Sequence, residues 1–407
     1  MDRFQGVLGI VVIFGLVFLA SKFRTRINWR ILGAGFALQI VTALLVLKWE
    51  PGFKALQAVS GGVSTLIKYA DEGTKFVFGG LVGNKDIGFI FALGVLPVII
   101  FIGALIGLLY YLRVIQWFIE IVGTAMKWVV GTSKIESVWA TTVVFLGMSE
   151  APLVIAPYLK KLTKSALFTC MVGGFASVAG STLVGYSLLG APLPFLIAAS
   201  VMNAPASLVI AKGLFPETEE SDLDGSVRDV KDTESANVID ALARGALSGG
   251  HLAVIVGCLL IAFIAVIAMA NGMISGIAGW FGHPEITFDK IFGWIFAPVA
   301  WLIGVPWNEA PTVGNLIGQK TVLNEFVAYS NLGPMVTGNQ LSPKSVLIST
   351  FALAGFANFG SIAIMIGSLG SLVPERRGEI AKNGLFALLG GTLANLLNAA
   401  IAGVVGS

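Results

Sequence analysis

Charged side chains are scarce in this 407-residue chain: Asp, Glu, Lys and Arg make up 12% of it, whereas 56% of its residues are hydrophobic and its mean hydropathy is +0.87. So few polar residues cannot cover the surface of a soluble globule of this size. The composition therefore predicts an integral membrane protein. The net charge of +3 is small and basic residues cluster near apolar spans, so nucleic-acid binding is not indicated.

Cysteine and histidine are scarcer still, with two of each. Cys170 and Cys258 both lie in apolar segments, which argues against a disulfide framework or a thiolate metal site. His251 opens an apolar span, and His283 lies in a loop without a second ligand at metal-binding spacing. We therefore expect no metal site and no cofactor. The first apolar stretch, 7–20, lacks a basic leader and a small-residue cleavage site, so we expect a retained span.

Long apolar runs are what the sequence has in abundance. A helix needs about 20 apolar residues to cross a bilayer, and eight runs are candidates: 5–21, 31–48, 88–111, 165–189, 192–211, 246–271, 345–371 and 381–405. Two further regions, 134–160 and 292–327, carry Gly, Pro and acidic residues in mid-segment, which favours re-entrant helical hairpins. Segment 53–69 mixes apolar and polar positions and is expected to lie along the interface. The predicted fold is an all-α polytopic membrane protein with about eight transmembrane helices and two re-entrant hairpins.

The basic residues beside these spans predict an orientation, because they favour the cytoplasmic side. With eight spans, one side receives Lys22, Arg24, Arg26, Arg30, Arg113, Lys160, Lys161, Lys164, Arg376, Arg377 and Lys382. Both termini are then outside, and the loop 212–245, which holds nine of the 23 acidic residues, is a solvated cytoplasmic connector. The two hairpins enter from opposite sides, which indicates an inverted repeat.

An internal repeat in the sequence leads to the same conclusion. The pairs Ser149-Glu150 and Asn324-Glu325 each precede a Gly-Phe-Ala tripeptide, at 174–176 and 355–357, where we expect the helix to break. Glycine-rich stretches favour local unwinding, and unwound backbone offers carbonyl and amide groups to a ligand or ion. One such tripeptide alone would indicate close helix packing. Two of them, each after an acidic residue, favour a binding site.

Glu150 and Glu325 are the principal candidate functional residues. Gly147 and Pro152 bracket Glu150 and permit a turn at membrane depth, where ionisable side chains are rare and mostly functional. The alternatives for Glu150 are a structural cap and a side chain that reaches the membrane interface. For Glu325 the alternative is an ion pair with Lys320, although five residues is a poor pairing interval on a helix.

Two other acidic residues and two other functional classes stay open. Glu136 and Glu309 lie near the entries of the hairpins, where capping or solvent exposure explains them as well as function does. Paired acids would also suit an intramembrane hydrolase, but no His or Cys nucleophile arrangement accompanies them. A channel is a third class, although nothing in the chain forms a repeated ring of ligands by itself.

The groups near the breaks indicate the chemistry of the ligand. Ser177 with Ser181, and Asn358 with Ser361, supply hydroxyl and amide groups, and Phe356 supplies a ring. Neither break contains Lys or Arg, so an anion would be repelled or left unpaired. A neutral or cationic ligand is expected, and a sugar joined to a heterocycle would use both the polar groups and the ring.

Two motifs are specific enough to name a family. Residues 147–152, Gly-Met-Ser-Glu-Ala-Pro, and residues 318–329, which contain Gly-Gln-Lys and Asn-Glu-Phe-Val-Ala-Tyr, resemble the GxTEAP-like hairpin tip and the G-x-K-x3-NEFVA-Y signature of the concentrative nucleoside transporters. The resemblance spans nearly the whole chain. It implies a secondary active nucleoside importer of the bacterial-type inner membrane, a homotrimer in which a transport domain moves like an elevator against a scaffold.

The resemblance also implies a division of the chain. The scaffold takes 1–112 and the long span with its interfacial segment, 246–291. The transport domain takes the two hairpin repeats, 113–211 and 292–407, and the acidic loop 212–245 joins them. In that family, hairpin tip and broken helix hold the nucleobase and the second motif holds the ribose, which here implies Gly147, Met148, Ser149, Glu150, Ser181 and Thr182 for the base, with Phe356 beside it, and Glu325, Asn358 and Ser361 for the ribose.

Two departures from the family pattern bear on specificity and coupling. Met148 stands where many members have glutamine and resembles the purine-preferring members, since a thioether packs on a larger ring system. Sodium-coupled members have an asparagine where this chain has Val143, although Ser177 is kept. The loss of an oxygen ligand favours proton coupling, with Glu150 as the first candidate carrier and Glu325 as the second. The alternative is a sodium-coupled or broad-specificity nucleoside symporter, since unwound backbone can also coordinate ions.

Overall fold

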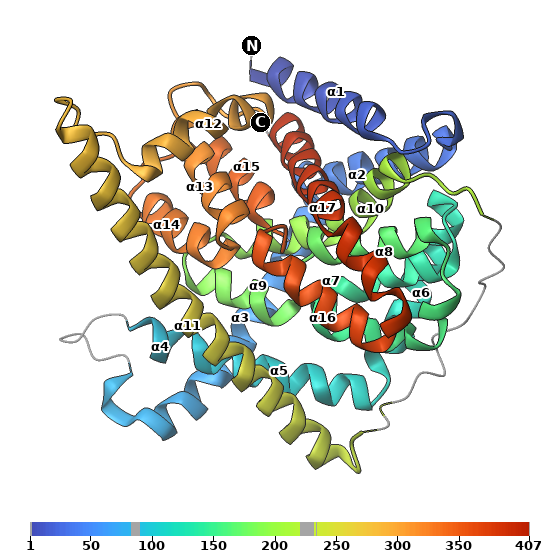
Figure 1. Ribbon diagram of the computed structural model, residues 1–407. Helices are drawn as coiled ribbons and strands as arrows, with labels where there is room; N and C mark the ends of the chain where they lie inside the picture. Colours follow the sequence, from blue (N-terminus) through green and yellow to red (C-terminus); the bar gives the residue numbers. More distant parts are fainter. Residues whose placement is uncertain (1, 83–89, 220–231, 233, 407) are drawn as a thin grey trace.

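The protein is described by a computed structural model over residues 2–82, 90–219, 232 and 234–406, and these residues form helices and connecting turns (Figure 1). The N-terminal part contains α1 Asp2–Ala20, α2 Trp29–Leu47, α3 Glu50–Phe78, α4 Phe91–Gly94, α5 Leu96–Tyr111 and α6 Val114–Val130. Because the helices are apolar and closely packed, the structure confirms the predicted all-helical polytopic class.

The first repeat contains α7 Lys134–Ile155, the 3-10 segment Ala156–Lys161, α8 Lys164–Ala176, α9 Gly180–Leu188 and α10 Leu193–Leu214. Gly147 divides α7 into two arms, since its φ of 70° and ψ of 179° lie outside the helical region. That backbone conformation is essentially restricted to glycine. The expected tip of the first hairpin therefore lies at Gly147.

The second half contains α11 Val238–Gly279, α12 Phe288–Leu302, α13 Ala310–Val322, α14 Glu325–Thr337, α15 Pro343–Leu353, α16 Phe359–Leu372 and α17 Arg377–Val405. The predicted bounds of the second hairpin, 292–327, were wrong. They include α12 and stop just inside α14, whereas the turn at Leu323 and Asn324 joins α13 to α14. Asn324 caps α14 by accepting a hydrogen bond from the Val327 amide, so Glu325 lies in the first turn of a new helix.

Each repeat begins its broken helix in the same way. The hydroxyl of Thr163 caps α8 and the hydroxyl of Ser342 caps α15. Each of these hydroxyls also donates to a carboxylate 2.9 Å away, from Glu217 in the first case and from Glu309 in the second. Caps, hairpins and breaks thus occur in the same order in both halves, as the repeat in the sequence predicts.

The two breaks differ in their relation to the Gly-Phe-Ala tripeptides. In the first repeat the tripeptide is still helical, and the break follows at 177–179. In the second repeat α15 ends at Leu353, so the tripeptide lies within the break 354–358. The prediction that both helices break at the tripeptide was therefore wrong for the first copy, where the break begins at the residue directly after the tripeptide. As a result, Phe175 is fully buried whereas Phe356 reaches a pocket.

Several helices are longer or more numerous than the sequence predicted. The span 246–271 is part of α11, which extends over 42 residues because Asn237 caps it well before the apolar run. The interfacial segment 53–69 belongs to the 29-residue α3. The helix α6 was not predicted. Residues 88–89 of the expected third span, and 220–231 and 233 of the acidic loop, lie outside the described residues.

Seven helical segments within the described ranges are long and apolar enough to cross a membrane: Trp29–Leu47, Phe91–Tyr111, Lys134–Lys161, Lys164–Leu188, Leu193–Leu214, Val238–Gly279 and Pro374–Val405. The predicted eight differ for a structural reason. The run 345–371 is divided into the short helices α15 and α16, and the first hairpin is long enough to be included among the spanning segments. The first run forms the apolar helix α1, of which Phe4–Ala20 is the part whose side chains the structure describes.

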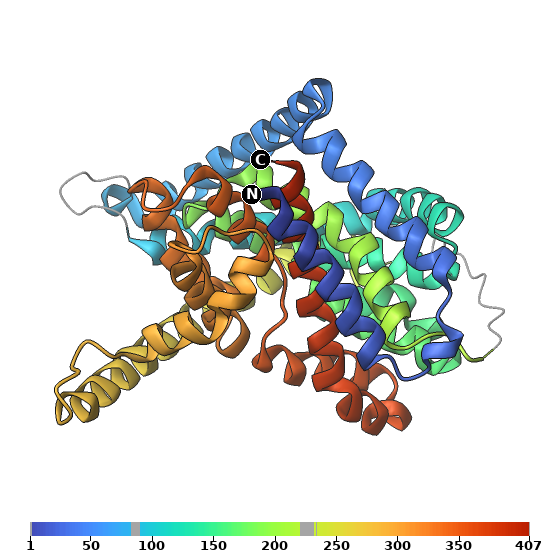
Figure 2. The same ribbon diagram turned by 90° about the horizontal axis from the view of Figure 1, so that it is seen from above.

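The long helix α11 runs diagonally along one edge of the molecule (Figures 1 and 2). It packs on α5 through glycines: a Cβ atom built on Gly245 would lie 2.6 Å from the Gly103 carbonyl oxygen, and one on Gly249 would lie 2.7 Å from that of Ile99. The two backbones are therefore in direct contact, as small residues allow in membrane helices. This crossing forms one wall of the pocket described below.

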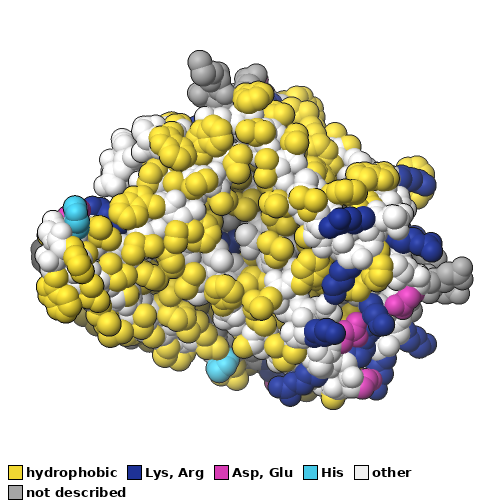
Figure 3. Space-filling view, turned by 45° about the horizontal axis from the view of Figure 1, so that its top comes forward, with side chains coloured by type: hydrophobic (Ala, Val, Ile, Leu, Met, Phe, Trp, Pro, Cys, Tyr) yellow, Lys and Arg dark blue, Asp and Glu magenta, His cyan; other side chains and the backbone are white. Residues whose placement is uncertain are grey.

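The surface view shows apolar side chains over most of one face and Lys and Arg gathered toward one end (Figure 3). Contacts explain how distant basic segments come together there. Lys22 donates to Asn383 at 2.8 Å, and Arg376 donates to the Leu162 carbonyl at 2.6 Å. The ends of α1, α8 and α17 that carry basic residues thus lie at the same end of the molecule.

Candidate functional site

A pocket of about 810 Å³ lies where the first hairpin and both helix breaks meet the crossing of α5 and α11. On one side it is lined by seven of the residues expected to bind substrate: Gly147, Met148, Ser149, Glu150, Ser181, Thr182 and Phe356. On the other side it is lined by α5 and α11, with Gly107, Tyr110, Gly245 and Ser248 among the contributing residues. Ligand pockets commonly have volumes of about 300–1,000 Å³, so the cavity is large enough for a small organic molecule.

The hairpin tip packs directly on the two breaks. A Cβ atom on Gly147 would lie 2.7 Å from the Cβ atom of Ala179 and 3.5 Å from the ring of Phe356. No other residue type fits this position, because both its backbone angles and the space around it require glycine. The tip is thereby held against the first turn of α9 and against the second break.

The two breaks are also hydrogen-bonded to each other. The Phe356 amide donates to the Ser177 carbonyl at 3.1 Å. Asn395 of α17 donates through its side-chain amide to the carbonyls of Ala176 and Ala354, at 2.7 and 3.1 Å. These carbonyls have lost their helical partners at the breaks, and buried carbonyls without partners are costly. Asn395 therefore stabilises both unwound segments at once.

Glu325, Asn358 and Ser361, the three residues expected to hold the ribose, are not among the residues that line the pocket. Glu325 is enclosed instead by its hydrogen-bond partners. Its side chain is 3% exposed and accepts two hydrogen bonds, from the Tyr186 hydroxyl at 2.9 Å and from the Asn358 amide at 3.0 Å. Asn358 in turn caps α16 by accepting from the Ser361 amide. Asn358 stands two residues after Phe356, so the second break carries a pocket residue and a partner of Glu325 together.

The predicted alternative for Glu325, an ion pair with Lys320, is not found among the described residues. Lys320 is instead fully buried and donates to the Ala352 carbonyl at 3.1 Å and to Asn395 Oδ1 at 2.7 Å. Its ammonium thus lies at the C-terminal end of α15, where a positive charge is stabilised by the helix dipole.

Glu150 has a different environment from Glu325. It lines the pocket and accepts a hydrogen bond from the Ser248 hydroxyl of α11 at 3.0 Å. Unlike a capping carboxylate, it has a partner on another helix. Its counterpart Glu325 is held within the two repeats, whereas Glu150 is held across the pocket.

Val143 and Ser177, the two positions that bear on ion coupling, are both buried. Val143 lies one turn before the hairpin tip and presents only carbon atoms. The Ser177 hydroxyl lies 3.4 Å from the Gly174 carbonyl and belongs to the first break.

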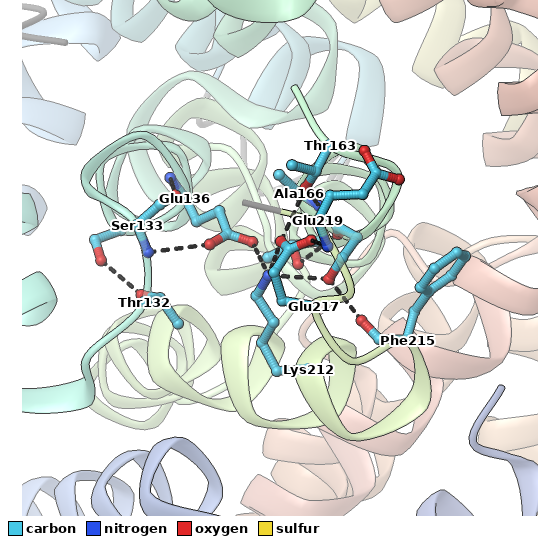
Figure 4. A network of polar contacts seen from close by, with 12 residues as sticks. Thr132, Ser133, Glu136, Thr163, Ala166, Lys212, Phe215, Glu217 and Glu219 are labelled. Atoms are coloured by element: carbon cyan, nitrogen blue, oxygen red, sulfur yellow. Dashed lines mark hydrogen bonds and ion pairs between the residues drawn. The ribbon is translucent and has the colours of Figure 1, made fainter. Parts of the chain in front are cut away.

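Glu136 and Glu309 have structural partners away from the pocket. Glu136 forms a capping box with Ser133 and lies 2.6 Å from the Lys212 ammonium, which also contacts Glu217 at 3.1 Å (Figure 4). A buried pair of this kind joins the base of the first hairpin to α10. Glu309 accepts from the amide and hydroxyl of Ser342. Glu136 thus follows the capping alternative that the sequence left open, whereas the Glu309 side chain does not cap its own helix α13 and binds Ser342, the residue that caps α15.

Comparison with known families identifies the chain. Residues 195–403 match the family model described as the C-terminus of Na+ dependent nucleoside transporters, and residues 8–81 match the model of their N-terminus. Residues 92–193 match a model described as nucleoside recognition. The chain belongs to the concentrative nucleoside transporter family. The transporter reading of the two motifs is thereby confirmed, and the intramembrane hydrolase is not supported.

Relatives of this nucleoside transporter extend along its whole length. It is 49% identical to the uncharacterized transporter YutK of Bacillus subtilis over 99% of this chain and 100% of that protein. It is 42% identical to the nucleoside permease NupC of Helicobacter pylori over 98% of this chain and 96% of that protein. It is 40% identical to human solute carrier family 28 member 3 over 98% of this chain and 59% of that longer protein.

Solved structures show the same fold. CNTnw in an inward-facing, substrate-bound state is 45% identical and superposes with a TM-score of 0.95, covering 100% of this chain and 99% of that chain. A doubly substituted variant of CNTnw in an outward-facing state gives a TM-score of 0.96 with the same coverage.

Four residues of the transporter's site region were missed, or read differently, from sequence. Tyr186 binds Glu325, and Ser248 binds Glu150. Lys320 and Asn395 are hydrogen-bonded to each other behind the breaks, and we call this contact the node. Lys320 belongs to a recognised motif, but its partner is 75 residues away. Tyr186 and Ser248 are polar residues inside apolar spans, and that pattern could have indicated that they bind other polar groups. Asn395 could have been suspected for the same reason, since buried polar groups in membranes need partners.

Proposed function

We propose that this family member is a secondary active importer that couples the entry of purine nucleosides to protons by an elevator-type movement. Transport of nucleosides rests on family membership and on the convergence of the hairpin tip and both helix breaks on one pocket. A pocket of about 810 Å³ lined by the Phe356 ring and the Glu150 carboxylate suits a neutral ligand that combines a flat ring with hydroxyls.

We assign groups to the nucleoside from the family resemblance, and the positions of the base-binding group support it. Met148, Ser149 and Glu150 at the tip, with Ser181 and Thr182 on α9, line the pocket and would contact the base. Glu325, Asn358 and Ser361 would hold the ribose, because a buried carboxylate and amide offer acceptors and donors to adjacent hydroxyls.

Met148 supports a preference for purines. Its side chain is buried, and its Cβ atom lies close to Gly174 of α8. A thioether cannot pair with the edge of a pyrimidine as an amide can, but it packs well on a larger ring system.

Val143 supports proton coupling. Its side chain supplies no oxygen at the position one turn before the tip, so a sodium ion near Ser177 would have one ligand fewer. Glu150 is the proposed proton carrier, since it is the carboxylate of the hairpin tip and lines the pocket. Intramembrane carboxylates are common components of proton relays. Glu325 is the second candidate.

The transport movement would carry the two repeats past the scaffold, which we assign to α1–α5 and α11. CNTnw has been captured in inward-facing and outward-facing states, which supports alternating access in this relative. We propose a homotrimer in the cytoplasmic membrane with both termini outside. The gathering of basic segments at one end supports that orientation.

Inosine uptake into sodium-free proteoliposomes, with and without an inward proton gradient, tests this function. Accumulation only with the gradient supports proton-coupled nucleoside import. Accumulation only after sodium is added keeps nucleoside transport and replaces the proton by sodium. Uptake that never exceeds equilibrium would contradict a secondary active carrier.

A further inference from the structure

We propose that Ser248 is a positioning residue for Glu150: its hydroxyl holds the empty hairpin tip against the scaffold, and substrate replaces it. This inference rests on the proposed transport function and adds a residue from outside both repeats. The starting observation is the 3.0 Å hydrogen bond from Ser248 Oγ to Glu150 Oε1, which joins residues 98 positions apart.

The two carboxylates of the repeats differ in where their partners come from. Glu325 is bound by Tyr186 of α9 and Asn358 of the second break, both inside the repeats. Glu150 is bound by α11, which lies outside them. A movement of the repeats past α11 can leave the bonds of Glu325 intact, but it must break the bond of Glu150.

Ser248 is held in place by the packing of its own helix. Gly245 and Gly249 flank it and bring α11 into backbone contact with α5. A residue between two such contacts has little freedom to follow the hairpin. The Ser248 hydroxyl therefore acts as a fixed point, and Glu150 is the partner that leaves.

The charged side chains near Glu150 do not bind its carboxylate in place of Ser248. Among the described residues, Arg244 is the one Lys or Arg side chain that lines the pocket, and it forms an ion pair with Glu234 instead of with Glu150. Glu150 also faces Tyr110 of α5 and Asp232, which line the same pocket. Neither is a cation. His251 also lines the pocket, but in the part of the chain that the structure describes the side-chain hydrogen bond to Glu150 comes from the Ser248 hydroxyl.

The consequence for transport concerns the empty carrier. When a nucleoside occupies the pocket, its own donors engage Glu150, and the loaded carrier moves without the Ser248 bond. When the pocket is empty, the bond must break before the repeats can return. Hydrogen bonds to charged groups are the stronger ones, so their loss should change the return step selectively.

The first part of the test needs no substrate. Hydrogen–deuterium exchange of the backbone at 147–155 is compared in detergent for the wild type, Ser248→Ala and the control Ser275→Ala. Ser275 is also on α11 and donates to the Pro284 carbonyl, far from the pocket. We expect faster exchange at the hairpin tip in Ser248→Ala alone. Equal protection in all three proteins would overturn the contact.

The second part compares two transport modes in proteoliposomes. Equilibrium exchange of inosine requires only the loaded carrier to move, whereas net uptake also requires the empty carrier to return. We expect the ratio of net uptake to exchange to rise at least threefold in Ser248→Ala and to return toward the wild-type value in Ser248→Thr, which keeps a hydroxyl. A ratio that is unchanged or lower, including an equal loss of both modes, overturns the role.

The two parts distinguish failure of this inference from failure of the proposed function. Absence of inosine exchange in the wild type contradicts nucleoside transport, and the exchange of backbone hydrogens then decides the Ser248 contact alone. Wild-type exchange with an unchanged ratio in Ser248→Ala contradicts only the role of Ser248.

Discussion

The ammonium of Lys320 lies 2.7 Å from the Oδ1 atom of Asn395, and this contact joins the second hairpin to the last helix behind both helix breaks. Lys320 is buried with an amide and a carbonyl as its acceptors. Burial of an ammonium is costly unless it is fully hydrogen-bonded. The two hydrogen bonds of Lys320 therefore explain how its buried ammonium group is tolerated.

Replacement of Asn395 by leucine should destabilise the protein strongly. It would remove an acceptor from the Lys320 ammonium and the donor to the Ala176 carbonyl. Loss of a hydrogen bond to a charged group costs about 1.5–3 kcal/mol, and a buried carbonyl left without a donor adds about 1–3 kcal/mol. Thermal unfolding in detergent measures the effect, with Thr392→Ala as the control, since the Thr392 hydroxyl bonds only within its own helix. A similar midpoint for both variants would contradict the role of the node.

Replacement of Lys320 by methionine should cost less than replacement of Asn395, because the charge leaves together with its need for acceptors. The double variant should be less destabilised than the sum of the two single losses, since the residues are in direct contact. Thermal unfolding of the two single variants and the double variant gives this comparison. Strict additivity would show that the two side chains act independently.

Glu325→Ala should abolish binding of ribonucleosides, because Tyr186 and Asn358 would lose the acceptor that orders them and the sugar would lose its carboxylate. Tyr186→Phe removes one donor and should weaken inosine binding about tenfold, in line with about 1.5–3 kcal/mol for a bond to a charged group. Isothermal titration in detergent measures both. Glu309→Gln is the control, since Glu309 binds Ser342 away from the pocket. Robust inosine uptake by Glu325→Ala would reject this assignment.

Glu150→Gln should retain inosine exchange but lose accumulation driven by a proton gradient. The amide keeps a hydrogen-bonding side chain at the pocket, but it cannot take up and release a proton. Uptake by proteoliposomes with and without the gradient separates the two modes. Gradient-driven accumulation at the wild-type level would exclude Glu150 as the carrier and direct attention to Glu325.

Met148→Gln should raise the uptake of uridine relative to inosine. The new amide could pair with the edge of a pyrimidine, while the loss of the thioether weakens packing on the larger purine. Competition between the two labelled nucleosides in the same vesicles measures the ratio directly. A ratio equal to that of the wild type would show that Met148 does not set the preference.

Gly147→Ala should impair substrate binding more than it impairs folding. Alanine would be strained by about 1–3 kcal/mol at these backbone angles, and its Cβ atom would press on Ala179 at the entry to α9. The control is Gly131→Ala, which has a comparable positive φ of 85° with open space around its Cβ position. Inosine affinity and thermal midpoint are measured for both. Equal losses of affinity would show that strain alone, rather than tip packing, is responsible.

Much of the fold was predictable because the features that a helix needs to cross a membrane are carried by residues close together in the sequence. Long apolar runs indicate the helices, and glycine and proline indicate their interruptions. The two dipeptides that contain a glutamate, Ser149-Glu150 and Asn324-Glu325, indicate the hairpins. The second hairpin was misplaced for a local reason: the turn at Leu323 has no glycine or proline, whereas the surface turn between α12 and α13 contains both. The first break was misplaced because Gly174 remains helical when its helix is buried on all sides.

The sequence by itself determined the membrane class, the repeat, the two carboxylates and the family motifs, since each is encoded in residues close together in the chain. Only the tertiary structure decided how the carboxylates differ: Glu325 is enclosed by Tyr186 and Asn358, and Glu150 faces a hydroxyl of α11. Hydrogen bonds between residues 98 or 139 positions apart depend on which helix faces meet. That is a property of packing, which no local pattern of residues specifies.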